Sequence, residues 1–161
     1  MRAGVVTVSS SLARDGGDDR SGDHLVDLCT AAGLEVSHEL LPDDRAQIAA
    51  ALRRLADEED ARFVFTTGGT GLTPDDVTPE ATRSVIERDA PGFAEAMRAE
   101  GARHTPLGIL TRGVSGVAAQ TLIVNFPGSP KAIDQLFVVL APTLGHVVQT
   151  LRGDSSHHGR H

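Results

Sequence analysis

Residues 62–82 read RFVFTTGGTGLTPDDVTPEAT, in which a short apolar run leads into a glycine-rich turn and then into two adjacent carboxylates. The run Phe63–Phe65 is typical of a buried strand. Three of the four residues in Gly68–Gly71 are glycines without Cβ atoms, so the backbone N–H groups of this turn can approach an anion closely. Asp75 and Asp76 follow directly. A function for this segment must therefore explain why an anion site would lie beside two acids.

Apolar runs alternate with segments of helical periodicity along the chain. Strands are predicted at residues 3–9, 34–41, 62–67, 107–110 and 121–126, the second near an edge of the sheet. Helices are predicted at residues 21–32, 45–58, from the capping hydroxyl of Thr78 and Pro79 onward, and at residues 91–101 and 131–151. The polar segment 10–20 predicts a loop, and Pro142 is expected to kink or break the last helix. This alternation predicts an α/β fold, a three-layer sandwich with a mostly parallel sheet.

Length and composition favour one domain. The chain has 161 residues, of which 40% are hydrophobic, so residues 1–152 are predicted to form a single α/β domain and residues 153–161 a flexible tail. The formal net charge of −7 argues against a nucleic-acid-binding protein. The single cysteine, Cys29, excludes an intrachain disulfide and is expected to be an inert core residue.

The apolar segments are short. None approaches the roughly 20 residues of a membrane-spanning helix. The first residues, Met1–Val5, enter a predicted strand and do not resemble a signal peptide. A cytoplasmic protein that does not contact a membrane is therefore expected.

The predicted sheet brings four loops to one edge. In parallel α/β sheets, ligands bind beyond the carboxyl ends of the strands. The loops that this rule gathers are residues 9–22, 41–44, 66–78 and 126–131. Asp43 and Asp76 lie in two of them, and together they could hold Mg²⁺, which favours carboxylate oxygens with substrate phosphates and water. Alternatively, Asp43 or Asp44 caps the following helix, and Asp75 or Asp76 accepts N–H bonds within its turn.

Other polar residues in these regions also suggest ligand contacts. Thr67 and Thr70 add hydroxyl donors to the glycine turn. Arg112, just past a predicted strand, could grip a phosphate or carboxylate with its fork of donors, or could be a solvated surface arginine. The segment Asn125–Lys131 precedes a helix whose N-terminus can bind an anion, and Lys131 adds charge there. Its prolines and glycine would equally explain a rigid turn.

Five motifs stand in the order of a known family. They are DRSG at residues 19–22, TTGGTG at 66–71, DVTPEAT at 76–82, PGFAE at 91–95 and NFPGSP at 125–130. With these motifs the chain resembles the molybdenum-cofactor biosynthesis family of the MogA/MoaB type, from about residue 3 to about residue 150. The competence-damage family shares a version of this domain.

The resemblance implies a function in molybdenum cofactor biosynthesis. Adenylyltransferases of this family join the AMP part of ATP to the terminal phosphate of molybdopterin and release pyrophosphate, with Mg²⁺ as cofactor. The product later receives molybdate, which implies a downstream molybdate-inserting partner, and family members form homotrimers or hexamers. Two alternatives stay open: a non-catalytic molybdopterin carrier of the MoaB type, and a nucleotide pyrophosphatase of the competence-damage type.

The resemblance also implies roles for residues. The family's two important acids correspond to Asp43 and Asp76, which would position Mg²⁺ and the nucleotide. The residues expected to contact phosphates are Ser21, Gly22, Thr67, Gly68, Gly69, Thr70 and Gly71. Those expected to hold the pterin or its phosphate are Thr111, Arg112, Asn125, Pro127, Gly128 and Lys131. The chain departs from the family at Ser10, where many members have aspartate, and at Thr111, where many have serine.

Overall fold

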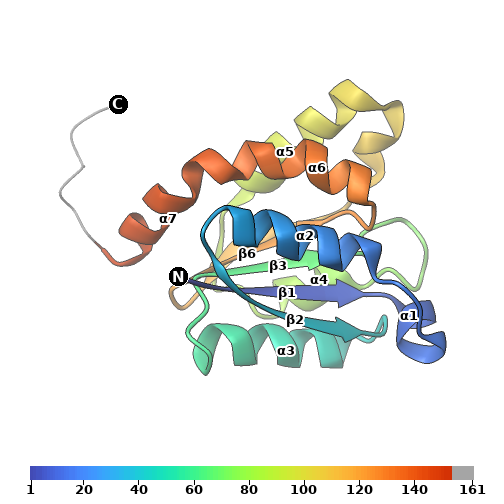
Figure 1. Ribbon diagram of the computed structural model, residues 1–161, viewed down its shortest axis with the longest axis horizontal. Coiled ribbons are helices and arrows are strands. Elements are labelled where there is room, and N and C mark those ends of the chain that lie inside the picture. The colour runs from blue at the N-terminus through green and yellow to red at the C-terminus, as the bar shows by residue number, and fades with distance from the viewer. Residues whose placement is uncertain (154–161) are drawn as a thin grey trace.

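The computed structural model of the protein describes residues 1–153. Six strands form one sheet that is covered by helices on both faces (Figure 1). The strands are β1 (Arg2–Val8), β2 (Glu35–Leu41), β3 (Phe63–Thr67), β4 (Arg88–Asp89), β5 (Ser115–Ala118) and β6 (Thr121–Phe126). The predicted three-layer α/β fold is confirmed. The predicted tail, residues 153–161, lies outside the described residues except for Gly153.

The sheet is mostly parallel, as predicted. Its strand order is β2-β1-β3-β6-β5-β4. The pairs β1–β2, β1–β3 and β3–β6 are parallel, whereas β5 runs antiparallel to both β6 and β4. β2 is an edge strand, as its looser apolar pattern predicts, and most of its side chains are exposed or half-buried. The four parallel strands therefore end at the same side of the molecule.

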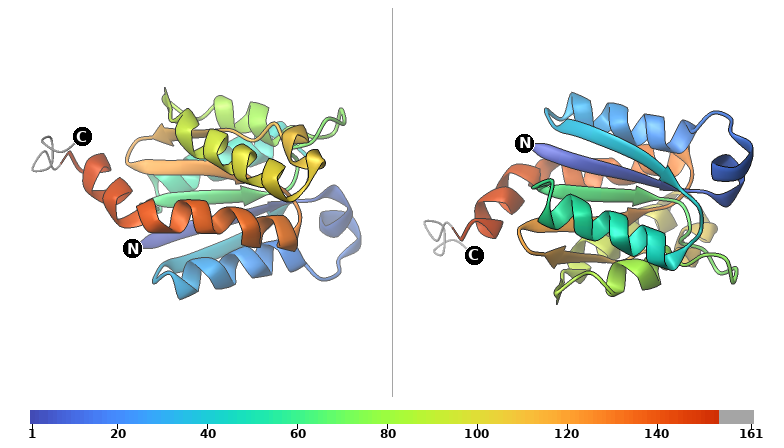
Figure 2. Two further views of the ribbon diagram at one scale, coloured as in Figure 1. Left: turned by 90° about the horizontal axis from the view of Figure 1, so that it is seen from above. Right: turned by 90° about the horizontal axis from the view of Figure 1, so that it is seen from below.

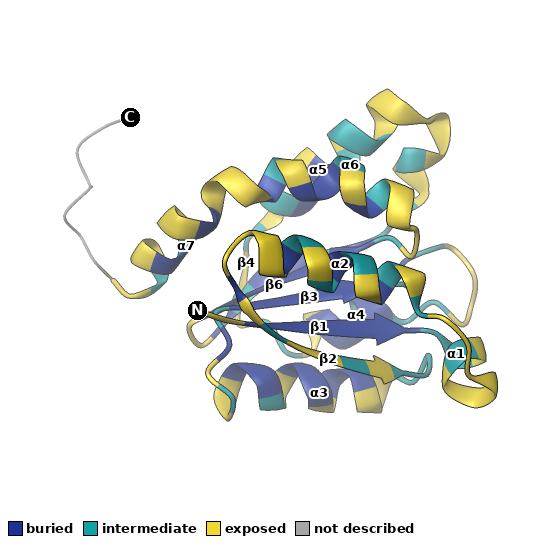
Figure 3. Cartoon of the chain, viewed as in Figure 1, coloured by how far each residue is buried: buried dark blue, intermediate teal, exposed yellow. Residues whose placement is uncertain are grey.

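Two helical layers sandwich this sheet, as the views from above and below show (Figure 2). The helices on one face are α2 (Arg20–Ala31), α5 (Pro91–His104), α6 (Pro130–Leu140) and α7 (Leu144–Leu151). Those on the other face are α3 (Arg45–Asp57) and α4 (Thr78–Arg83). In Figure 3 the buried residues of these helices face the sheet and the exposed ones face outward.

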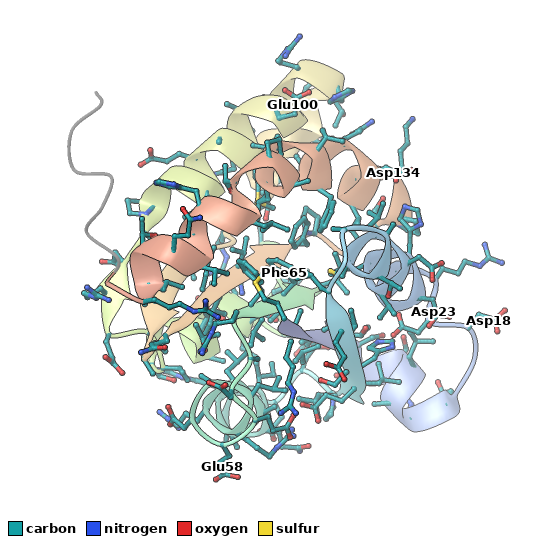
Figure 4. All side chains as sticks on the ribbon, turned by 60° about the vertical axis from the view of Figure 1, so that its left-hand side comes forward. Asp18, Asp23, Glu58, Phe65, Glu100 and Asp134 are labelled. Atoms are coloured by element: carbon teal, nitrogen blue, oxygen red, sulfur yellow. The ribbon has the colours of Figure 1, made fainter. Side chains whose placement is uncertain are left out.

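The two-residue alternation of the strands divides the core in two. In β3, Phe63 and Phe65 pack with the α2 and α6 layer, while Val64 between them packs against α3. The ring centroid of Phe65 lies 5.7 Å from those of Phe63 and Phe126. Figure 4 shows Phe65 inside the molecule, with Glu58, Glu100 and Asp134 at its surface. The apolar run that begins the motif is thus the centre of the core.

Cys29 lies in this core, as predicted. It is fully buried in α2. Burial raises the pKa of its thiol to about 12, since a thiolate would lose its hydration there. Cys29 therefore packs as a small apolar side chain.

The loop predicted after β1 at residues 10–20 is correct for residues 16–19 but wrong for its first part, which is helical. Residues 10–15 form α1 (Ser10–Asp15). The side chain of Ser9 accepts the N–H of Leu12 and caps this short helix. The polar composition of α1 gave no helical pattern in the sequence, because α1 buries no residue and so needs no apolar stripe.

The strand predicted at residues 107–110 is also wrong. These residues belong to a 3₁₀ helix, η1 (Pro106–Leu110), which begins where Thr105 accepts the N–H of Leu107. Leu107 and Ile109 are 68% and 69% exposed, so the run is apolar without being buried. The sheet instead contains β5, with the sequence SGVA, and the two-residue β4.

The last predicted helix is broken at Pro142, as expected. α6 ends at Leu140, the 3₁₀ helix η2 (Ala141–Thr143) follows, and α7 continues to Leu151. Taken as one segment of 22 residues, Pro130–Leu151 is long and apolar enough to cross a membrane by length and composition. The expectation that no stretch approaches that length is therefore wrong. Ile133 and Phe137 of this segment pack in the core, which is typical of a core helix of a globular domain.

Candidate functional site

The loops after the parallel strands meet at one edge of the sheet. Val8 is in register with Leu41, Thr7 with Thr67, and Thr67 with Phe126. The loops that follow β1, β2, β3 and β6 therefore begin at the same level, which confirms the predicted grouping.

The glycine turn, residues 68–71, is packed too closely to accept larger residues at its start. Gly68 and Gly69 have φ of +94° and +67°. A Cβ on Gly68 would overlap the carbonyl oxygen of Val8, and one on Gly69 would overlap the hydroxyl of Thr78. Thr78 does not cap α4 as predicted, because its hydroxyl donates to the Gly68 carbonyl at 3.0 Å. Both glycines are thus required by conformation and by space.

Three of the four N–H groups of the glycine turn have no hydrogen-bond partner among the described residues. The Gly68 N–H donates to the carbonyl of Phe126 at 3.2 Å. Within residues 1–153, no hydrogen bond uses the N–H groups of Gly69, Thr70 or Gly71. Consecutive unpaired backbone donors form a concave anion-binding site, so the turn has the chemistry predicted for a phosphate cradle.

A cavity of about 390 Å³ adjoins this turn. Its lining includes nine predicted residues: Gly68, Gly69, Thr70, Gly71, Asp76, Thr111, Asn125, Pro127 and Gly128. The opposite wall, which sequence reasoning missed, comes from α5, η1 and α6 and includes Met97, Leu107, Leu110 and Leu136 with Arg98 and Gln135. This size and this mixture of apolar and polar lining are typical of small-molecule sites. Met97 is buried in α5, a helix that the sequence predicts, whereas η1 had no recognisable signal.

Asp43 and Asp76 flank the glycine turn. A Cβ on Gly69 would lie 3.2 Å from Asp43 Oδ1, and a Cβ on Gly71 would lie 2.8 Å from Asp76 Oδ2. Asp76 lines the cavity, whereas Asp43 lies outside its lining. The two predicted acids therefore lie beside the same four residues of the turn.

The alternative roles of the neighbouring acids are also resolved. Asp44, not Asp43, caps α3, because its side chain accepts the N–H of Gln47 at 2.9 Å. Asp76 Oδ2 accepts the N–H and hydroxyl of Thr73, at 3.1 and 2.9 Å, as the turn hypothesis expected. Its Oδ1 has no hydrogen bond to the described residues, so Asp76 can stabilise the turn and still offer an oxygen to a ligand.

Arg112 holds the glycine turn instead of extending into open space. It lies before β5 and not after a strand. Its Nε donates to the Gly71 carbonyl at 2.7 Å, its Nη2 to the Asp76 carbonyl at 2.8 Å, and its Nη1 to Glu80. The guanidinium lowers the pKa of Glu80, and the carboxylate raises the pKa of Arg112. A direct contact between Arg112 and a ligand stays a prediction.

Asn125 and Thr67 are also occupied by the protein. Asn125 Nδ2 donates to the hydroxyls of Thr66 and Thr82, at 2.9 and 3.0 Å, and its Oδ1 accepts the N–H of Val114. Thr67 donates its hydroxyl to the Pro127 carbonyl at 2.8 Å. These side chains position the loop after β6 beside the glycine turn, and their contact with a ligand remains untested.

Ser21, Gly22 and Lys131 lie outside the cavity lining. Ser21 donates its hydroxyl to the Gly128 carbonyl at 3.1 Å, which ties α2 to the loop after β6. The Gly22 N–H donates to Asp19, and a Cβ at Gly22 would overlap that same carboxylate. Lys131 is exposed in the first turn of α6, with no ion pair in residues 1–153. Ser21 and Gly22 therefore support the structure around the cavity without lining it.

Comparison with known proteins shows the family of this chain. The family described as "Probable molybdopterin binding domain" matches residues 4–146. The chain belongs to this family. It is 37% identical over 151 residues to the molybdopterin adenylyltransferase of Escherichia coli K12, covering 92% of this chain and 77% of that protein. The crystal structure of the molybdopterin biosynthesis enzyme MoaB of Thermus thermophilus superposes with a TM-score of 0.87 at 41% identity, covering 94% of this chain and 96% of that chain.

A longer relative contains the same domain. The molybdenum cofactor synthesis protein cinnamon of Drosophila melanogaster is 38% identical over 155 residues, which are 95% of this chain. The matched region is only 26% of cinnamon's length. In that relative, the domain is therefore one part of a larger protein.

The packing of Gly68 yields a first prediction. The substitution Gly68→Ala should lower the free energy of unfolding by about 1–3 kcal/mol, because alanine is strained at positive φ and its Cβ would overlap Val8. Gly145→Ala is the matched control, since it lies in α7 with nothing within 4 Å of an added Cβ. Urea unfolding of both variants tests this, and equal stabilities would contradict it.

A second prediction concerns pH. Arg112 lowers the pKa of Glu80, so the stabilisation from this pair is present above the unfolded carboxyl pKa and is lost as the pH falls through the folded one. The wild type should therefore have a higher urea midpoint than Glu80→Gln near neutral pH. The difference should shrink below about pH 4. Glu95→Gln, at an exposed position, is the control and should show no such trend; a difference that is independent of pH would refute the pair's role.

Proposed function

We propose that this protein binds molybdopterin and transfers AMP from ATP to its terminal phosphate, with release of pyrophosphate. The observation that carries the proposal is the glycine turn, whose residues Gly69, Thr70 and Gly71 line a cavity of about 390 Å³, have backbone N–H groups without a partner in residues 1–153, and lie beside two carboxylates. A relative at 37% identity is named molybdopterin adenylyltransferase, which supports the same assignment.

The turn and the cavity suit the two kinds of group that such substrates contain. Phosphate oxygens are acceptors, and the backbone donors of the turn would bind them without a charged side chain. The apolar wall formed by Met97, Leu110 and Leu136 would cover a ring system, while Arg98 and Gln135 offer polar atoms for its edge. Arg98 also donates to the Gly113 carbonyl at 2.6 Å, which holds its guanidinium in the cavity wall.

The proposed reaction needs little covalent help from the protein. A terminal phosphate oxygen of molybdopterin attacks the α-phosphorus of ATP. The bond from that phosphorus to the bridging oxygen breaks, and its electron pair leaves with pyrophosphate. The contribution of this chain is to hold both phosphates at the glycine turn and to place donors where negative charge develops.

The acids at this turn fit Mg²⁺. Asp43 and Asp76 each have an Oδ1 without a hydrogen bond to residues 1–153, and carboxylate oxygens are the hard donors that this ion prefers. The described residues contain no group of three or more His, Cys, Asp or Glu side chains that could enclose a metal. This agrees with the usual binding of Mg²⁺ by one or two carboxylates together with substrate phosphates. The ion would neutralise phosphate charge during transfer.

A molybdopterin carrier without turnover is the second candidate. Ser10, at the position where many family members have an acid, favours it, because a serine cannot supply a further carboxylate to the metal. Purified protein incubated with molybdopterin, ATP and Mg²⁺ separates the two functions. Adenylylated pterin and pyrophosphate are expected; binding of molybdopterin without either product would identify a carrier.

Asp76 provides the sharpest mutational test. Asp76→Asn should keep the fold but lose more turnover than the roughly 10–100-fold that is typical when a partner of a metal ligand is removed, because a neutral amide is a poor Mg²⁺ ligand. Asp75→Asn is the adjacent control, since Asp75 is exposed and makes no hydrogen bond in the described part of the chain. Full activity in Asp76→Asn would remove this acid from the mechanism.

We further propose a homotrimer or hexamer in the cytoplasm that passes its product to a molybdate-inserting protein. Large exposed apolar side chains, Leu72, Leu107 and Ile109, support contact with other chains. Sedimentation equilibrium distinguishes these assemblies from a monomer, and a monomer at micromolar concentration would contradict them.

A further inference from the structure

Ser10 and Asp43 exchange three hydrogen bonds. The Ser10 N–H and hydroxyl donate to Asp43 Oδ2, at 3.1 and 2.8 Å. The Asp43 N–H in turn donates to the Ser10 hydroxyl oxygen at 2.9 Å. These bonds join the first residue of α1 to the loop after β2, across 33 residues of sequence. One serine side chain thus fixes both the carboxylate and the backbone of Asp43.

The two oxygens of the Asp43 carboxylate are consequently not equivalent. Oδ2 accepts both bonds from Ser10, whereas Oδ1 accepts none from residues 1–153. Oδ1 is also the oxygen near the glycine turn, since a Cβ on Gly69 would lie 3.2 Å from it. The bonds to Ser10 therefore leave the oxygen that faces the turn available.

Asp76 is held in the same way on the other side of the turn. Its Oδ2 accepts the N–H and the hydroxyl of Thr73, and its own N–H donates to the Thr73 carbonyl at 3.1 Å. In both cases a single hydroxyl residue supplies an amide and a hydroxyl to one carboxylate oxygen. Neutral donors thus restrain two acids that would otherwise be free to rotate.

We propose that Ser10 is a positioning residue that directs Asp43 Oδ1 toward the metal and phosphates at the glycine turn. This inference rests on the proposed function and deepens it. Ser10 does not replace a missing metal ligand; it orients an existing one. A carboxylate at position 10 would remove the donated hydroxyl bond and place a second negative charge against Asp43. The site thus accommodates the carboxylates of Asp43 and Asp76 but not a third one at position 10.

The experiment measures Mn²⁺ binding in the presence of ATP, from the electron paramagnetic resonance signal of free Mn²⁺. This readout does not depend on turnover. The variants are Ser10→Ala, Ser10→Thr and Ser10→Asp, with Ser11→Ala as the matched control, because Ser11 is exposed on the same helix and its hydroxyl contacts only that of Ser9. Urea unfolding of each variant reports on the fold, and the Mg²⁺ dependence of adenylylation is measured in parallel.

The expected result is a roughly 10-fold or greater rise in the Mn²⁺ dissociation constant for Ser10→Ala, as is typical when a ligand loses its orienting partner. Ser10→Asp should bind at least as weakly, whereas Ser10→Thr and Ser11→Ala should stay close to the wild type. Equal Mn²⁺ affinity in Ser10→Ala and Ser11→Ala, or tighter binding in Ser10→Asp than in the wild type, would overturn the proposal.

Failure of the proposed function gives a different pattern. If the wild type forms no adenylylated pterin but Ser10→Ala still weakens Mn²⁺ binding, the reaction is refuted and the positioning role is supported. If the wild type is active and Ser10→Ala matches Ser11→Ala in metal affinity and Mg²⁺ dependence, only the positioning role fails. Wild-type protein that binds no Mn²⁺ with ATP refutes both.

Discussion

The close contact between the turn after β3 and the end of β1 is the constraint on which the site depends. Gly68 lies so near the Val8 carbonyl that no Cβ fits on it. Gly128, in the loop after β6, lies against Gly68, and a Cβ on Gly128 would be only 3.2 Å from the Gly68 Cα. The turn therefore meets the end of β1 and the loop after β6 at backbone atoms of Gly68, Val8 and Gly128. No hydrogen bond within residues 1–153 uses the N–H groups of residues 69–71, and these residues line the cavity. The same contact that closes the sheet edge thus holds the turn that we propose as the anion site.

The presence of acids beside this anion site follows from how charge is distributed around it. The guanidinium of Arg112 donates to two backbone carbonyls and to Glu80. Its positive charge therefore stabilises the turn and is balanced by the Glu80 carboxylate. The turn itself offers neutral donors. In the proposed reaction, the negative charges of Asp43 and Asp76 lie beside substrate phosphates, and a divalent cation would offset the repulsion between them. An anion loop and two carboxylates are compatible when a divalent ion lies between them, which the proposed reaction includes.

Much of the fold was predictable because its strongest signals are buried. The run Phe63–Phe65 and the TLIVNF sequence of β6 are apolar, β-prone and fully buried, so their pattern and their environment agree. The carboxyl-edge rule then located the glycine turn and both acids. The apolar pattern gave wrong predictions where the composition of a segment does not match its burial. η1 is apolar but exposed, and β5 is built from small residues, so the sequence of neither indicates its structure.

Side-chain roles were less predictable than positions, for a physical reason. Arg112, Asn125 and Thr67 are at the site, yet the hydrogen bonds of each are made to other groups of the protein: backbone carbonyls, buried hydroxyls and, for Arg112, the Glu80 carboxylate. Sequence identifies a residue type at an edge but not which of several acceptors lies within 3 Å of it. The same limit hid the bond between Ser10 and Asp43, which are 33 residues apart. A serine that looked like the loss of an acid is, in the folded chain, the donor that holds the remaining one. Its effect on function should therefore be sought in the geometry of Asp43 and not in the number of carboxylates.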